Sequence, residues 1–285
     1  MDENKNKIVG GTLYLVTTPI GNMSDITYRA VKALREVDFI AAEDTRNTAK
    51  LLHYLEITKE TVSYHEHNKK SRGPEILARI AAGESCALVT DAGTPAISDP
   101  GEDLVRLCAE NNIPVTATPG VSAAITALTL SALPTRYFAF EGFLPVTKSE
   151  RKTRLSLLAK ETRTMILYEA PHKLTKTLND LFEALGNRKV SLCRELTKLN
   201  EEVMRISLAE AVEYYKANAP RGEYVLIVEG NETAENEANV FWTNISIAEH
   251  IEHYIQQGMT KNDAIKAAAK DRNVPKNVIY NTYVK

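Results

Sequence analysis

The chain has 285 residues, 44% of them hydrophobic, and its formal charges nearly cancel at −2. This composition excludes a disordered chain, which is poor in apolar residues, and a protein that coats nucleic acid over its whole surface, which would be basic. No apolar run reaches the roughly 18 residues that span a bilayer, and the polar start Met1–Lys7 predicts no secretory signal. Three widely spaced cysteines, Cys86, Cys108 and Cys193, suit a reducing cytoplasm, where we expect the protein, with no metal site.

Short apolar runs alternate with longer amphipathic stretches in the first half of the chain. The apolar runs predict strands at 13–16, 39–42, 87–89 and 113–115. Amphipathic spacing predicts helices at 28–37 and 102–111. Because apolar strands separated by helices are typical of a sheet covered on both faces, we predict an α/β domain over residues 10–133.

The second half shows the same alternation. It predicts strands at 137–140, 165–168, 190–193 and 224–228, and helices at 152–159, 173–185 and 208–216. Ser207 and Glu210 form a predicted capping box at the start of the last helix. An Ala/Thr/Leu-rich segment at 120–133 predicts a helix that joins the halves. We therefore predict a second α/β domain over residues 134–230.

The last part of the chain is helical in period. A polar, acidic segment at 230–241 predicts a linker. Beyond it, Ser246, Thr260 and Pro275 mark the starts of three short helices, so we predict a helical module at 242–285 that resembles a helix-turn-helix unit. Its basic residues suit contacts with nucleic-acid phosphates, or an ordinary solvated surface; they are Lys261, Lys266, Lys270, Arg272 and Lys276.

Segments rich in Gly, Pro and short polar residues follow four of the predicted strands, at 17–22, 43–46, 90–101 and 118–122. In α/β sheets the ligand crevice lies at the carboxyl ends of the strands, so we expect these segments to line one edge together. Gly and Pro there let the backbone approach a ligand. None matches a dinucleotide-binding or P-loop motif, and no nucleophile elbow is present.

Six segments in order resemble the bacterial ribosomal RNA small subunit methyltransferase I family, which belongs to the tetrapyrrole-methylase-like class of S-adenosylmethionine (SAM) enzymes. They are Leu13–Asn22, Glu43–Arg46, Asp91–Gly101, Thr118–Ser122, Gly142–Pro145 and Tyr168–His172. The resemblance covers essentially the whole chain. It implies two α/β domains of the tetrapyrrole methylase type with the SAM cleft between them, plus a small C-terminal helical module. It also implies 2′-O-methylation of a cytidine ribose in 16S rRNA of the 30S subunit, and a homodimer.

The wider class opens with a Gly-rich loop of the G-x-G-P-G-D type, whereas this chain has Thr17-Thr18-Pro19-Ile20-Gly21-Asn22. That departure favours an RNA substrate over a porphyrin-like ring. The class's Gly-Asp-Pro segment is similar to Gly93-Thr94-Pro95. The resemblance implies that SAM is held by Ile20, Asp91, Gly93, Thr94, Pro95, Ile97, Ser122, Ala123 and Tyr168, with Glu223-Tyr224 nearby. The apolar side chains suit the adenine, and the helix start at Ser122 suits the carboxylate.

Methyl transfer to a hydroxyl requires a group that accepts its proton. We expect the catalytic residues at Glu43, Asp44 and Arg46, with a carboxylate as the base and Arg46 on a phosphate. The alternative is that Asp44 caps a helix and Arg46 is solvated. Other acceptors stay open: Asp91, Asp99, Glu66, Glu195, His65 and His67. We do not expect zinc at His65-Glu66-His67, because no third ligand has a suitable spacing.

Basic runs offer phosphate contacts or solvated surfaces. They are Asn68–Arg72, Lys148–Arg154, and Lys173 with Lys176. For Arg194-Glu195 with Lys198, the two alternatives are residues that line the cleft and an internal ion pair. Two other functions remain open for the chain. One is a SAM-dependent methylase of a small tetrapyrrole, and the other is a non-catalytic helix-turn-helix regulator.

Overall fold

The computed structural model describes residues 7–231, 242, 245–272 and 274–284. Residues 232–241 of the predicted linker lie outside this set. The chain forms two compact units: one holds the described residues up to 159 and 163–230, and the other holds 160–162 and the described residues from 231 on. Within the described ranges, no helix is long and apolar enough to cross a membrane.

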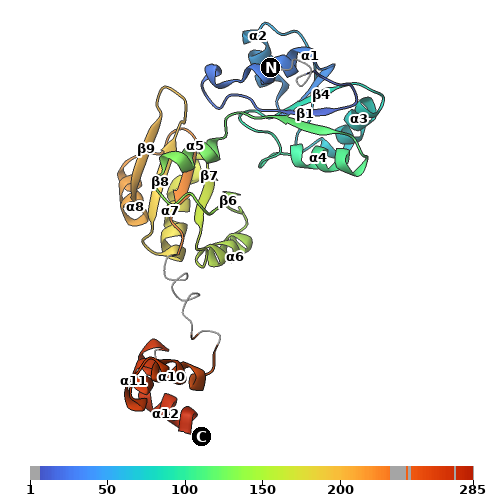
Figure 1. Cartoon of the computed structure of the whole chain (residues 1–285). Coiled ribbons are helices and arrows are strands. Elements are labelled where there is room, and N and C mark those ends of the chain that lie inside the picture. The colour runs from blue at the N-terminus through green and yellow to red at the C-terminus, as the bar shows by residue number, and fades with distance from the viewer. Residues whose placement is uncertain (1–6, 232–241, 243–244, 273, 285) are drawn as a thin grey trace. The chain divides into compact units, whose positions relative to one another are not determined.

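The first sheet has five parallel strands in the order β3-β2-β4-β1-β5. Figure 1 labels its neighbouring strands β1 and β4. The strands are β1 (Leu13–Val16), β2 (Phe39–Ala42), β3 (Glu60–Ser63), β4 (Cys86–Val89) and β5 (Val115–Thr118). The helices between them are α1 (Tyr28–Glu36), α2 (Thr45–Tyr54), α3 (Lys69–Ala81) and α4 (Gly101–Glu110), with a short 3-10 helix at Met23–Asp25.

Side chains of successive strand residues point to opposite faces of this sheet, so each strand serves two cores. Tyr14 and Ile40 pack in one cluster with Leu34 of α1. Their neighbours Leu13 and Phe39 pack in another cluster, with residues of α3 and α4. This double burial explains why the strands read as continuous apolar runs.

The second sheet is mixed, in the order β6-β7-β10-β8-β9, with β6 and β7 parallel and the other pairs antiparallel. Its strands are β6 (Phe138–Phe143), β7 (Thr164–Glu169), β8 (Lys189–Arg194), β9 (Glu202–Ser207) and β10 (Tyr224–Val228). Helices α6 (Lys148–Leu158), α7 (Pro171–Leu185) and α8 (Leu208–Ala217) pack on one face of it. The predicted capping box of Ser207 and Glu210 is present at the start of α8.

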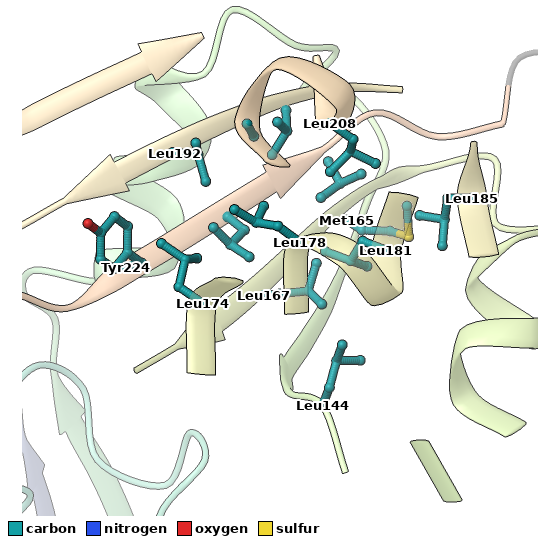
Figure 2. Close-up of a cluster of buried hydrophobic side chains, with 14 of the residues drawn as sticks. Leu144, Met165, Leu167, Leu174, Leu178, Leu181, Leu185, Leu192, Leu208 and Tyr224 are labelled. Atoms are coloured by element: carbon teal, nitrogen blue, oxygen red, sulfur yellow. The ribbon is translucent and has the colours of Figure 1, made fainter. Parts of the chain in front are cut away.

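Figure 2 shows the core of this face. Leu174, Leu178 and Leu181 of α7 pack against Leu167 of β7 and Leu192 of β8. The three α7 leucines are spaced four and three apart, so they lie on one side of the helix. All three are fully buried, and burying a leucine side chain contributes roughly 1.5–3 kcal/mol.

Helix α5 (Ala123–Leu130) follows the last strand of the first sheet and packs on the second sheet. Ala127 and Leu128 lie in a cluster with Ile166 and Val225, against which Ile20 from the loop after β1 also packs. The predicted joining helix at 120–133 is therefore present but shorter. Helix α5 lies within the first predicted domain in sequence, but it packs with the second sheet. The domain limits 10–133 and 134–230 stay predictions.

The second unit contains α10 (Ile247–Gln256), α11 (Lys261–Asp271) and α12 (Lys276–Val284) around a core that includes Ile251 and Ile265. The side chains of Ser246 and Thr260 cap α10 and α11, as the sequence predicts.

One predicted strand is displaced in the structure, and two strands of the structure were not predicted. The strand predicted at 113–115 lies at Val115–Thr118, because the Pro114 carbonyl accepts the Leu13 N–H at the entry to the pairing and Pro114 itself has no N–H. Strands β3 and β9 are absent from the prediction. Both are edge strands that mix polar residues with half-buried ones, so neither shows a continuous apolar run.

Candidate active site

Four loops meet at the carboxyl edge of the first sheet. Strands β2, β4, β1 and β5 are adjacent and parallel, so the segments that follow them leave on the same side. A cavity of about 440 Å³ lies there, lined by Glu43, Asp91, Ile20 and Ala123 from these four segments. Residues of the second sheet, among them Tyr168, complete its wall. The carboxyl edge of the first sheet, where the sequence predicts a ligand, therefore contains a cavity.

Several residues predicted to bind SAM line this cavity; they are Ile20, Asp91, Ile97, Ala123 and Tyr168. Ile97 is 51% exposed, so its side chain is available to a ligand and is not part of a core. The others, Gly93, Thr94, Pro95 and Ser122, are not among the lining residues.

Gly93 and Thr94 hold the loops together behind the cavity wall. Gly93 and Thr18 exchange two backbone hydrogen bonds, of 2.9 and 3.0 Å. The φ of Gly93 is +81°, which favours glycine, and a Cβ there would lie 3.3 Å from Cγ2 of Ile20. The Thr94 hydroxyl donates to the Val121 carbonyl at 3.2 Å. These contacts tie together the loops after β1, β4 and β5.

Asp99 shapes the loop that carries Ile97. Its Oδ1 accepts the N–H groups of Ala96 at 3.0 Å and Gly101 at 2.8 Å, and its Oδ2 accepts that of Ile97 at 3.1 Å. Ala96 and Ser98 have φ angles of +67° and +65°, which cost non-glycine residues about 1–3 kcal/mol each. The Asp99 carboxylate offsets this strain, so this candidate proton acceptor has a structural role.

Glu43 and Asp91 present carboxylates to the cavity. Thr90 Oγ1 donates to Glu43 Oε2 at 2.6 Å, and the Asp91 N–H donates to the same oxygen at 3.4 Å. Partial desolvation raises the pKa of the Asp91 carboxyl above its ordinary value, and the charges of Glu43 and Asp44 raise it further, against a hydrogen bond from Asn47 that lowers it. A carboxylate with a raised pKa is a better proton acceptor at neutral pH.

Asp44 and Arg46 do not line this cavity. Asp44 Oδ1 caps α2 by accepting the Arg46 N–H at 2.8 Å, and Oδ2 accepts from Arg46 Nη2 at 2.7 Å. Hydrogen bonds from the side chain and backbone of Arg46 lower the pKa of Asp44 to about 2. These contacts match the alternative in which Asp44 caps a helix and Arg46 is solvated, since the Arg46 side chain is 86% exposed. A carboxylate with so low a pKa is a weak proton acceptor, so Glu43 and Asp91 are better candidates for the base than Asp44. The roles predicted for Asp44 and Arg46 stay predictions.

The loop after β8 approaches the loop after β1 closely. Lys198 Nζ lies 3.0 Å from an oxygen of Glu195 and 2.9 Å from one of Glu223. The Asn22 N–H donates to the hydroxyl of the neighbouring Thr197 at 3.1 Å. A Cβ on Gly21 would lie 2.4 Å from Cγ of Lys198. Glycine at position 21 therefore permits the contact that closes this side of the cavity.

Sequence reasoning gave no role to two lining residues, Phe143 and Glu169, although both lie in segments that carry the family resemblance. Glu169 is 4% exposed. It accepts the Ala170 N–H at 2.9 Å and the hydroxyl of Thr177, which in turn accepts from Arg151. The network fixes the start of α7 at the cavity wall.

Much of the predicted basic surface is internally paired. Lys69 pairs with Glu66 and Asp103, Arg72 with Glu75, Arg151 with Asp180, Arg154 with Glu141, Lys176 with Asp180, and Arg194 with Glu202. Lys148, Lys152 and Lys173 are exposed and stay candidates for phosphate contact.

In the second unit, Arg272 is structural. Its Nη2 donates to the Ile245 carbonyl at 2.7 Å and its Nε donates to Nδ1 of His250 at 3.0 Å. Lys261, Lys266, Lys270 and Lys276 are exposed there.

Over the described part of the chain, no group of three or more His, Cys, Asp or Glu side chains is arranged to hold a metal ion. In the segment His65-Glu66-His67, Nδ1 of His65 accepts the N–H of His67 at 3.2 Å.

Residues 12–212 match the family of Tetrapyrrole (Corrin/Porphyrin) Methylases. Uroporphyrin-III C-methyltransferase from Thermus thermophilus, solved in complex with S-adenosylhomocysteine, is similar in fold, with a TM-score of 0.54 and 19% identity. The match covers 76% of this chain and 96% of that one. The fold is that of the tetrapyrrole methylases, which confirms the fold class predicted from the sequence.

Relatives with higher identity define the branch. Ribosomal RNA small subunit methyltransferase I of Halalkalibacterium halodurans is 50% identical over 273 residues, which is 96% of this chain and 94% of the relative. The Bacillus subtilis protein of the same name is 47% identical over 274 residues, with the same two shares. The chain belongs to the ribosomal RNA small subunit methyltransferase I family, whose methyl donor is SAM.

Proposed function

We propose that the chain transfers the methyl group of SAM to the ribose 2′-hydroxyl of a cytidine in 16S rRNA of the small ribosomal subunit. The names of the relatives support small-subunit rRNA as the substrate. The observation that carries the choice of a hydroxyl acceptor is the position of Glu43 and Asp91, whose carboxylates line the same cavity as the predicted cofactor contacts. A ribose hydroxyl attacks effectively only when a neighbouring group takes its proton.

The cavity residues fit SAM. Ile20, Ile97 and Ala123 offer apolar surface to an adenine. Helix α5 begins at Ala123, and Ser122 makes no side-chain cap, which suits a ligand carboxylate at the helix start. The charged lining residues are mostly acidic and suit a sulfonium cation; they are Glu43, Asp91, Asp99, Glu169, Glu195 and Glu223, with Lys198 as the basic one.

When bound, SAM supplies an electrophilic methyl group. Asp91 accepts the proton of the attacking hydroxyl, because its raised pKa makes it a stronger base than an ordinary aspartate. Burial is the main cause of that raised pKa, and the negative charge of Glu43, which the Thr90 hydroxyl holds in place, raises it further. Asp99 holds Ile97 at the cavity, and the side chain of Ile97 excludes water from the reacting groups.

Phosphate groups of the RNA bind outside this acidic cavity. The exposed Lys148, Lys152 and Lys173 of the first unit, and Lys261 and Lys270 of the second, supply positive charge for such contacts. The homodimer implied by the family resemblance belongs to the same proposal.

A labelled-methyl transfer assay tests the function. Purified protein and tritiated SAM are offered 30S subunits from cells that lack this activity, naked 16S rRNA and uroporphyrinogen III in parallel. We expect label in the 30S RNA or the naked rRNA and none in the tetrapyrrole. Label in the tetrapyrrole alone would assign the chain to ring methylation instead.

A further inference from the structure

Strand β6 contains a bulge next to the cavity. The register of β6 against β7 shifts between Phe140 and Gly142, which makes Glu141 the extra residue. The side chain of Glu141 is 5% exposed and pairs with Arg154 of α6. Gly142 has a φ of +61°, and a Cβ on it would lie 3.1 Å from Oγ of Ser98. The bulge is thus held by an ion pair and a backbone conformation that favours glycine.

The bulge brings two aromatic rings to one face of the sheet. In a regular strand, residues three apart point to opposite faces. Here Phe140 and Phe143 pair with Ile166 and Tyr168, which are two apart and share a face. The ring centroids of Phe140 and Phe143 lie 5.2 and 5.7 Å from that of Tyr168, at interplanar angles of 75° and 63°.

Phe143 is 56% exposed although it belongs to this cluster, and it lines the cavity that holds Glu43 and Asp91. Ile97, 51% exposed, lines the same cavity from the first sheet. Exposed apolar surface gathered in a concave site indicates a ligand. Phe143 therefore offers an aromatic surface to whatever molecule enters beside the two carboxylates.

We propose that Phe143 is the stacking platform for the base of the nucleotide that is methylated. This inference rests on the proposed function. A ribose hydroxyl reaches carboxylates inside a cavity only when its nucleotide leaves the stacked RNA, and proteins hold such unstacked bases on aromatic side chains. The acidic lining repels phosphates, so the uncharged base and ribose are the parts of the nucleotide that the cavity can bind, and the base is the part that can stack on a ring. Phe143 acts as a positioning residue, because it binds the base and not the reacting oxygen.

The test compares Phe143→Ala with Phe143→Tyr, Phe143→Leu and the control Phe138→Ala. Phe138 lies on the same strand and is 39% exposed, but it is not among the cavity-lining residues. For each variant, kcat/KM for 30S methylation is measured at saturating SAM, the affinity for S-adenosylhomocysteine by calorimetry, and the oligomeric state by light scattering. Stacking of one base predicts that Phe143→Ala lowers kcat/KM by about 5- to 150-fold.

Support requires that Phe143→Tyr restores kcat/KM, that Phe143→Leu does not, and that the affinity for S-adenosylhomocysteine changes less than twofold. An equal loss in Phe138→Ala, or a change in oligomeric state, would make the surface a protein contact and overturn the proposal. Weaker S-adenosylhomocysteine binding in Phe143→Ala would assign the ring to the cofactor. Unchanged kcat/KM in Phe143→Ala removes only the base platform, whereas absence of RNA methylation by the wild-type protein removes the proposed function and this inference with it.

Discussion

Removal of the Asp99 carboxylate provides a quantitative test of how the cavity is built. The carboxylate accepts three backbone N–H bonds, from Ala96, Ile97 and Gly101, and a hydrogen bond to a charged acceptor contributes about 1.5–3 kcal/mol. Two residues of the loop have positive φ angles, at a cost of about 1 kcal/mol or more each. With the lower value for each of the three bonds and each of the two strained residues, the net stabilisation of the loop that carries Ile97 is about 2–3 kcal/mol. A loop without the carboxylate must be ordered by the ligand itself.

We therefore expect Asp99→Ala to weaken S-adenosylhomocysteine binding by about 30- to 150-fold. Asp99→Asn keeps an oxygen acceptor but loses the bond from Ile97, and we expect roughly a tenfold loss. Isothermal titration calorimetry measures both, with Glu102→Gln at the exposed start of α4 as the matched control. Circular dichroism shows that each variant folds. An affinity of Asp99→Ala within twofold of wild type would refute the account of this loop.

Four further substitutions have defined outcomes. Asp91→Asn lowers kcat by about 10²- to 10⁴-fold and removes the acid limb of the kcat/KM profile, since the active form is the carboxylate and activity is lost as pH falls through its raised pKa. Glu43→Gln removes a charge that raises this pKa, so the limb moves to lower pH; a move upward would contradict the assignment. Leu178→Ala, at a fully buried site, lowers the free energy of unfolding by about 2–5 kcal/mol in a urea titration, and a loss below about 1 kcal/mol would contradict the packing of α7. Gly21→Ala places a methyl group 2.4 Å from Cγ of Lys198 and destabilises the fold by about 1–3 kcal/mol, which a lowered Tm reports and an unchanged Tm would refute.

The central strands were predictable because burial on both faces leaves a continuous apolar run, as at Phe39–Ala42. The edge strands β3 and β9 lack that signature, since their residues are half-buried or exposed. Capped helix starts were equally visible: Ser207, Ser246 and Thr260 all accept a backbone N–H in their predicted helices. Local patterns therefore predict elements whose stabilising contacts are local or whose burial is complete.

The site was predictable where it depends on strand ends and not where it depends on distant pairing. Ile20, Asp91 and Ala123 follow strands whose parallel order places them at one cavity, although their binding roles stay predictions. Phe143 was missed because its direction depends on a bulge that appears only when β6 pairs with β7. The role of Arg151 could not be predicted for a similar reason, since Asp180, with which it forms an ion pair, lies 29 residues away in the sequence.

Nucleoside analysis of the methylated RNA distinguishes a ribose methyl group from a base methyl group. Small subunits from cells that lack this activity are incubated with the protein and SAM, and the rRNA is digested to nucleosides and measured by mass spectrometry. We expect 2′-O-methylcytidine in the product formed by the wild-type protein, and a strongly reduced amount with Asp91→Asn. A methyl group on a base, or full product from Asp91→Asn, would contradict the assignment of the cavity to ribose methylation.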